Sequence, residues 1–189
     1  LFVMDDGWFG DKYPRKNDSS SLGDWVVDKN KLPNGIEGLL SDAKKHGVKF
    51  GIWIEPEMAN TTSELYEKHP DWVLKASERD VVLGRGGTQV VLDLANPAVQ
   101  DFVFGVVDNL MTSYPEIDYI KWDANMSVQN HGSQYLTKDN QSHMYIEFHR
   151  GFEKICQRIR AKYPDLTIQA CASGGGRANY GVLPYFDEF

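Results

Sequence analysis

The sequence has few cysteines, no long apolar run and no excess of positive charge. Its two cysteines among 189 residues, Cys156 and Cys171, are too few for a disulfide framework, although the sequence leaves a single bridge open. No apolar run reaches the ~18–20 residues of a membrane-spanning helix, so we expect no membrane partner. A formal net charge of −7 argues against a nucleic-acid partner, because phosphate binding needs a basic surface.

Motifs for metals and nucleotides are also missing. The five histidines show no His-Glu-x-x-His or other ligand spacing, so no metal site is expected. The turn "DDGWFG" lacks the G-x-G-x-x-G spacing, and no G-K-[ST] follows the glycines of "CASGGGRANYG". The chain opens on strand-like residues without an initiator Met and has no stop signal at its end. We therefore expect a piece of a longer protein, of unknown compartment.

What the sequence does contain is a repeated strand–helix–strand pattern. Apolar runs that end in polar residues predict buried parallel strands at 1–6, 48–57, 88–94, 117–125 and 166–173, and 183–189 is a candidate sixth. Helical patterns lie between them at 35–47, 96–115 and 142–164. Gly47, Asn96 and Ser142 are the expected caps. The segments 7–34, 58–87 and 126–141 are expected to be loops.

Two α/β architectures fit this order, an open doubly wound sheet and a (β/α)8 TIM barrel. Polar residues end several different strands: Asp5, Asp6, Glu55, Glu57, Asp93, Asp123 and Ser173. Side chains drawn from many strand ends are typical of a barrel rim, whereas an open sheet concentrates them near one switch point. A whole barrel takes about 250 residues. We therefore predict a partial barrel of about five to six strands over residues 1–189.

Asp123 is the strongest candidate for chemistry. It ends the run "DYIKWDAN", and alternation along a strand puts Lys121, Asp123 and Asn125 on one face. A helix N-cap is the other interpretation of Asp123, but three polar side chains on one face do not all cap a helix. Because a neighbouring lysine favours the ionised carboxylate, we expect Lys121 to keep Asp123 charged, as a nucleophile requires.

Other polar strand ends leave alternatives open. Asp5 and Asp6 suggest hydroxyl recognition or a hard cation, and hydroxyls are favoured because no further oxygen ligand is close in sequence. In "GIWIEPEM", Trp53 is either core or a sugar platform, and Glu55 or Glu57 is a rival partner for Asp123 as acid/base.

The glycine-rich segment after the strand predicted at 166–173 is another candidate site. Three consecutive glycines let the backbone approach a ligand or adopt positive φ. Arg177, which follows them, would either hold a phosphate or pair with a carboxylate and orient it.

These segments together resemble the catalytic barrel of retaining α-galactosidases of glycoside hydrolase family 36. The matching stretches are "FVMDDGWF", "LGDWVVDKNKLPNGIEGL", "GVKFGIWIEPEM", "VVLDLANPAV", "YIKWDANM" and "CASGGGRANYG". They follow the family's order across nearly the whole chain. The resemblance implies hydrolysis of terminal α-galactosides such as melibiose or raffinose, with no metal or organic cofactor.

The resemblance also implies residue roles. Asp123, in K-W-D-x-N, would be the nucleophile that forms a covalent galactosyl-enzyme. Asp5 and Asp6 would bind O4 and O6, and Trp53 would shape the wall near O4. The remaining sugar contacts would be Arg85, Lys121, Asn125, Cys171 and Gly174, and Asn179 stands where the family pattern often has Asp.

The acid/base aspartate of the resembled family lies in a W-x-S-D-N-T-D segment that would follow Phe189. We therefore expect residues 1–189 alone to be inactive, unless Glu55, Glu57 or Asp187 serves as the acid. The family's N-terminal β-sandwich, last barrel strands and C-terminal β-domain would lie outside this chain, and the parent protein would be homo-oligomeric. Two alternatives stay open, an α-N-acetylgalactosaminidase on the same scaffold and a non-catalytic galactoside-binding protein.

Overall fold

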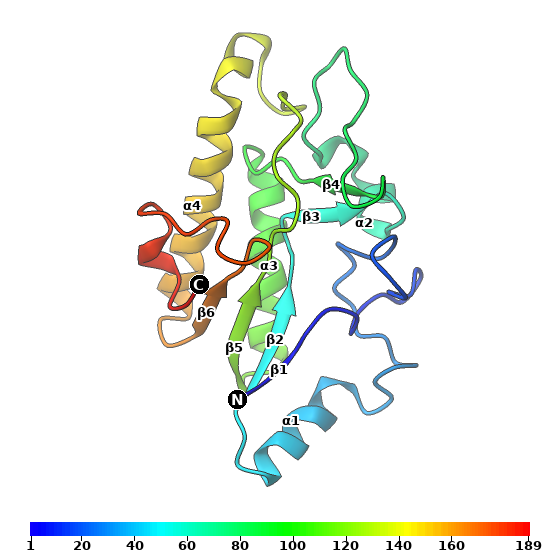
Figure 1. The fold of residues 1–189 in the computed structure, drawn as a ribbon, viewed down its shortest axis with the longest axis vertical. Coiled ribbons are helices and arrows are strands. Elements are labelled where there is room, and N and C mark those ends of the chain that lie inside the picture. Colours follow the sequence, from blue (N-terminus) through cyan, green and yellow to red (C-terminus); the bar gives the residue numbers. More distant parts are fainter.

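A four-stranded parallel sheet forms the centre of the computed structural model, which describes residues 1–189 (Figure 1). Its strands are β1 (Phe2–Met4), β2 (Phe50–Ile54), β5 (Ile117–Trp122) and β6 (Thr167–Ala170). All five residues of β2 are buried, as expected for a parallel strand covered on both faces. The strand order β1-β2-β5-β6 follows the chain without reversal. That order belongs to a barrel wall rather than to a doubly wound sheet, and the four strands do not close.

A helix follows each of the first three strands of this sheet. These helices are α1 (Gly35–Lys45), α3 (Pro97–Ser113) and α4 (Met144–Lys162), and Figure 1 shows α3 behind β2 and β5 with α4 beside β6. The Asn96 side chain accepts a hydrogen bond from the Ala98 N–H, which confirms it as the N-cap of α3. Gly47 has φ +65°, as predicted for the residue that ends α1. Ser142 is not a cap, because a 3₁₀ turn over Lys138–His143 precedes α4.

The predicted barrel strand at 88–94 is wrong. Gln89–Val91 forms β4, which pairs antiparallel with β3 (Met58–Asn60) in a separate two-stranded sheet. Asp93, which follows β4, is fully buried and does not reach the rim of the parallel sheet. Its carboxylate accepts hydrogen bonds from the Ser133 hydroxyl and the Ala95 N–H, so it anchors the segment after β5.

Two segments contain short elements that the sequence did not predict. The segment 58–87, expected to be loop, contains β3, the short helix α2 (Glu64–Lys68) and a 3₁₀ turn over Pro70–Trp72. The candidate strand 183–189 begins as a 3₁₀ turn over Leu183–Tyr185. It then pairs in parallel with β6, since the Asp187 N–H donates to Ile168 O and the Ala170 N–H to Glu188 O. The last residues therefore form an isolated parallel bridge to β6 and not a strand of their own.

The remaining features of the fold are the character of its helices and the state of its cysteines. No helix in the structure combines the length and the apolar character that crossing a membrane requires. Cys156 and Cys171 are both free thiols, so the structure contains no disulfide.

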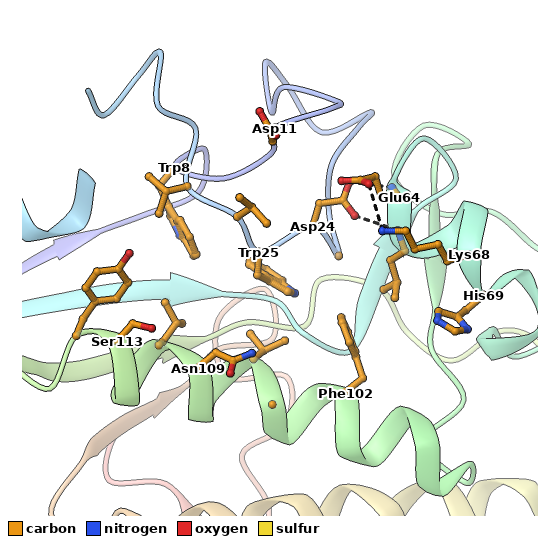
Figure 2. Close-up of a pocket in the computed structure, with 18 of the residues that line it drawn as sticks. Trp8, Asp11, Asp24, Trp25, Glu64, Lys68, His69, Phe102, Asn109 and Ser113 are labelled. Carbon is orange, nitrogen blue, oxygen red and sulfur yellow. Dashed lines mark hydrogen bonds and ion pairs between the residues drawn. The ribbon is translucent and has the colours of Figure 1, made fainter. Parts of the chain in front are cut away.

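An open groove of about 780 Å³ lies outside the sheet, between α3, α2 and the loop after β1 (Figure 2). Figure 2 shows Trp25 over α3, which contributes Phe102 and Asn109 from below, while Glu64 and Lys68 of α2 line another side. None of the carboxylates that end β1 or β5 lines this groove. It is thus separate from the site described next.

Candidate active site

The carboxyl ends of the parallel strands bring several acidic side chains to one edge of the sheet. Asp5 and Asp6 follow β1, Glu55 and Glu57 follow β2, and Asp123 follows β5. The register continues past the strands, because the Asp123 N–H donates to Ile54 O over 2.8 Å and the Cys171 N–H donates to Trp122 O. Residues 5–6, 53–57, 121–125 and 171–174 therefore form one polar edge.

Asp123 is buried at the centre of this edge, and four donors surround it. Its Oδ2 accepts from the Asn125 amide at 2.6 Å and from Trp53 Nε1 at 3.1 Å, while Oδ1 accepts from the Ala124 N–H at 2.9 Å. Burial raises the pKa of Asp123, but the hydrogen bonds from Asn125, Trp53 and the Cys171 thiol outweigh burial and lower it. The carboxylate is therefore ionised under ordinary conditions.

Lys121 is held mainly by Asp5 rather than by Asp123, although the charge of Asp123 also contributes to the raised pKa of Lys121. Lys121 Nζ lies 2.7 Å from Asp5 Oδ2, and this hydrogen bond raises the pKa of the lysine. The groups that bind Asp123 directly are Asn125, Trp53 and Cys171 instead. Lys121 thus joins β5 to the end of β1, and Asp5 is the carboxylate it holds.

Asp6 is held by a residue that the sequence analysis missed. Arg15, in the loop after β1, donates from Nε to Asp6 Oδ1 at 2.9 Å and from Nη2 to Asp6 Oδ2 at 2.7 Å. The arginine is 3% exposed. Its segment "KYPRKNDSS" carries charged and turn-forming residues, so nothing in the sequence marks it as buried.

Glu55 and Glu57 also belong to this polar edge, but both are 1% exposed, so their side chains are buried within it. Glu55 accepts a hydrogen bond from the Asn125 N–H, and burial raises the pKa of Glu55 to about 7. Glu57 accepts from Trp122 Nε1 at 2.7 Å and from Arg177 Nη1 at 2.6 Å. Of the two interpretations of Arg177, the structure therefore shows pairing with a carboxylate.

The glycine-rich segment closes one side of the site. Ser173 and Gly174 both have positive φ, at 51° and 90°, and the Ser173 hydroxyl donates to Asn125 Oδ1 at 2.9 Å. Cys171 lies within hydrogen-bonding reach of Asp123. Asn179 binds the Arg177 carbonyl and the Gly181 N–H, so it stabilises a turn within the segment.

Arg85 approaches from the hairpin loop before β4. Its Nη2 lies 2.6 Å from Asp18 Oδ2, and its side chain is 37% exposed. The sequence predicts a sugar contact for Arg85, and the structure shows that Asp18 already engages part of the guanidinium. No group of three or more His, Cys, Asp or Glu side chains is arranged to hold a metal ion.

The sequence as a whole matches the melibiase family over residues 1–189. The chain belongs to the melibiase family. Among its relatives, the probable alpha-galactosidase C of Aspergillus flavus is 43% identical over the whole of this chain, which covers 24% of the fungal protein. Alpha-galactosidase AgaA of Geobacillus stearothermophilus is 39% identical, with 100% of this chain and 25% of AgaA covered.

Solved structures of melibiase relatives share the fold. The alpha-galactosidase of Lactobacillus brevis superposes with a TM-score of 0.91 at 41% identity, over 98% of this chain and 24% of that one. A doubly substituted variant of the glycoside hydrolase family 36 enzyme AgaA of Geobacillus stearothermophilus, in complex with raffinose, gives a TM-score of 0.90 at 39% identity, over 97% and 25% of the two chains. These matches confirm the resemblance to family 36 and the partial-barrel fold. The chain spans about a quarter of the length of these relatives.

Proposed function

We propose that the protein hydrolyses terminal α-galactosyl residues of small oligosaccharides, with retention of configuration at the anomeric carbon. The observation that carries this proposal is the ionised Asp123 at the centre of an edge of polar and acidic side chains from several strands. The names of the relatives support it, since they are alpha-galactosidases, and AgaA has been crystallised with raffinose and with stachyose.

In the proposed first step, Asp123 attacks the anomeric carbon, and the glycosidic oxygen leaves with a proton from an acid. The galactosyl-aspartate ester then reacts with water, which gives up a proton to the same acid/base group. Two inversions leave the anomeric configuration unchanged.

We assign the sugar contacts to the side chains around Asp123. Asp5 with Lys121, and Asp6, would bind ring hydroxyls, because each carboxylate is ionically held and still partly exposed. Trp53 would form part of the wall of the site near O4. Its Nε1–H would also hold Asp123 in place through their hydrogen bond. The other proposed contacts are Arg85, Asn125, Cys171 and Gly174.

The proton donor is proposed to come from a carboxyl outside residues 1–189. Retaining hydrolysis uses two carboxyl groups about 5–5.5 Å apart on opposite sides of the scissile bond. Burial raises the pKa of Glu55 to about 7, so it keeps a proton below that pH, but it is 1% exposed and bound to the Asn125 N–H and does not reach a leaving group. Glu57 is equally buried and paired with Arg177, and Asp187 pairs with Arg160 at 2.6 Å. The sequence-based expectation of an acid beyond Phe189, in a parent chain with flanking β-domains, therefore stands as part of this proposal.

The test is hydrolysis of p-nitrophenyl α-galactoside by the full-length protein. We expect Asp123→Asn to lower kcat by several orders of magnitude, because the amide is a poor nucleophile. Asp118→Asn is the matched control, since Asp118 lies at the start of the same strand, away from the polar edge, and contacts only Lys49 at 4.0 Å and the Phe50 N–H at 3.3 Å. Azide should restore turnover to Asp123→Gly and give β-galactosyl azide, the product of one inversion.

Other outcomes would redirect the assignment. Full activity in Asp123→Asn would remove Asp123 as nucleophile. Faster cleavage of the α-N-acetylgalactosaminide would favour that alternative substrate, and galactose binding without turnover would favour a binding protein.

A further inference from the structure

Arg15 is buried in a part of the chain that otherwise lies at the surface. Its side chain is 2% exposed, whereas its neighbours Lys16, Asn17 and Asp18 are exposed. Burying a guanidinium costs free energy unless its charge and its N–H groups are matched. The contacts of Arg15 meet that requirement.

Each of the three guanidinium nitrogens of Arg15 donates at least one hydrogen bond. Nε and Nη2 donate to the two oxygens of Asp6, at 2.9 and 2.7 Å, as a bidentate fork. Nη1 donates to Ser20 O at 2.9 Å and to Asn60 Oδ1 at 3.0 Å, and Asp18 Oδ1 lies 3.5 Å from Nη2. The arginine therefore has one rotational position, which is set by four acceptor groups.

Asn60 fixes that position relative to the sheets. It lies in β3 with 0% exposure, and its Oδ1 also accepts from the Leu22 N–H at 2.9 Å. Its Nδ2 donates to Asp18 O at 2.8 Å and to Thr88 O at 3.2 Å. Through Asn60, the orientation of Arg15 depends on the β3–β4 sheet and not only on its own loop.

The fork constrains Asp6 in a way that a single charge would not. A carboxylate offers about four lone-pair sites, and two parallel N–H donors fix its plane while using two of them. The Asp6 side chain is 30% exposed, so the carboxylate remains partly accessible while it is held by Arg15. The adjacent Asp5 is held separately by Lys121 from β5, so each of the two neighbouring acids has its own cation.

We propose that Arg15 is a positioning residue of the sugar site, which orients the Asp6 carboxylate toward the hydroxyl groups of a galactosyl residue. The inference rests on the proposed function for the identity of the ligand. Arg15 touches no substrate in this scheme and acts through Asp6. Lysine cannot replace it, because an ammonium donates from one point and does not fix the plane of a carboxylate.

The experiment compares Arg15→Lys with wild type in the full-length protein. Arg15→Lys keeps the charge and loses the fork, so we expect KM for p-nitrophenyl α-galactoside to rise about tenfold with a smaller change in kcat. Arg158→Lys is the matched control. Arg158 is an exposed arginine of α4 with one hydrogen bond to Asp101, and its replacement should leave KM unchanged.

A double-mutant cycle separates positioning from general stability. If Arg15 acts through Asp6, Arg15→Lys should change KM less than twofold in an Asp6→Asn background, because the oriented carboxylate is already gone. Equal effects of Arg15→Lys with and without Asp6 would overturn the inference, and so would an unchanged KM in the single variant.

Folding and the identity of the ligand have their own controls. Thermal unfolding of Arg15→Lys and Arg15→Gln is measured alongside, and failure of both to fold while Asp6→Asn folds normally would show that Arg15 serves stability only. If wild type cleaves the galactoside but Arg15→Lys matches it, this inference alone fails. If wild type does not cleave the galactoside, the proposed function fails. The affinity for galactose, measured by calorimetry for wild type and Arg15→Lys, then takes the place of KM in the test of Arg15.

Discussion

Glu55 and Asp123 are two buried carboxyl groups whose pKa values the structure shifts in opposite directions, upward for Glu55 and downward for Asp123. Burial raises the pKa of Glu55 to about 7, and the charge of Asp123 adds to that effect. Asn125 contacts both groups, because its N–H donates to Glu55 and its side-chain amide donates to Asp123. With Glu55 protonated, the pair carries one negative charge, which resides on the proposed nucleophile.

Glu55→Gln should remove a pH-dependent loss of stability. Between pH 4.5 and about 7 the folded protein keeps a proton on Glu55 that the unfolded chain releases, so wild-type stability falls as pH rises through this window. Raising the pKa from 4.5 to about 7 corresponds to about 3 kcal/mol. The advantage of Glu55→Gln over wild type should therefore grow by about that amount from pH 4 to pH 8, as measured by denaturant unfolding.

Glu116→Gln provides the comparison for Glu55→Gln, since Glu116 is exposed and precedes β5. Its stability difference from wild type should not change over the same pH range. A Glu55→Gln difference that is equally flat would mean that Glu55 is ionised in the folded protein.

At the residue scale, the sequence predicted which groups gather but not how they pair. Alternation along β5 correctly indicated that Lys121 and Asn125 both act on Asp123, Asn125 through a hydrogen bond and Lys121 through its charge. It could not reveal that Lys121 binds Asp5, a residue 116 positions away. Arg15 was missed because its burial depends on Asn60, a partner 45 positions along the chain. Such pairings are set by the tertiary fold, and local pattern carries no information about them.

At the scale of the elements, two helical glycines that look alike in the sequence have different roles in packing. Gly151 of α4 faces the chain near Leu94 so closely that an added Cβ would lie 1.8 Å from the Leu94 carbonyl oxygen. Gly105 of α3 has nothing within 4 Å of the corresponding position. Only the first glycine is required by packing, because it allows α4 to approach the segment that leads from β4 into α3.

Gly151→Ala and Gly105→Ala should therefore change stability in opposite directions. Gly151→Ala forces α4 away from Leu94 and should destabilise the protein by about 2 kcal/mol or more. Gly105→Ala removes only the backbone freedom of glycine and should stabilise it by about 0.5–1 kcal/mol. Thermal unfolding of both variants provides the test, and equal shifts would contradict the close approach of α4.

The segment 88–94 shows why element types were easier to predict than their partners. Its buried apolar residues correctly indicated a strand, and Gln89–Val91 are all buried. Burial on both faces is common to a barrel strand and to a covered antiparallel pair, so the pattern could not distinguish them. The partner, β3, lies in a stretch of three residues, Met58–Asn60, which is too short for periodicity to detect.

At the scale of the whole molecule, the sheet has an open edge at β1. β1 pairs with β2 on one side only, and Phe2 is 52% exposed there. The partial barrel was predictable because strand and helix patterns repeat and polar residues end several strands. The number of strands in the parallel sheet, four, was not predictable, because the segment 88–94 pairs with β3 instead.

An exposed edge strand with an apolar side chain favours pairing with another chain, so residues 1–189 expressed alone should self-associate. Phe2→Lys should reduce this association, because a charge on an edge strand opposes strand addition. Ile146→Lys is the matched control, since Ile146 is also 52% exposed but lies in α4, where the backbone hydrogen bonds are internal. Light scattering coupled to size exclusion measures the mass of each variant. If both substitutions reduce the measured mass equally, general apolar exposure causes the association and not the β1 edge. If residues 1–189 are already monomeric without a substitution, the β1 edge does not recruit a second copy.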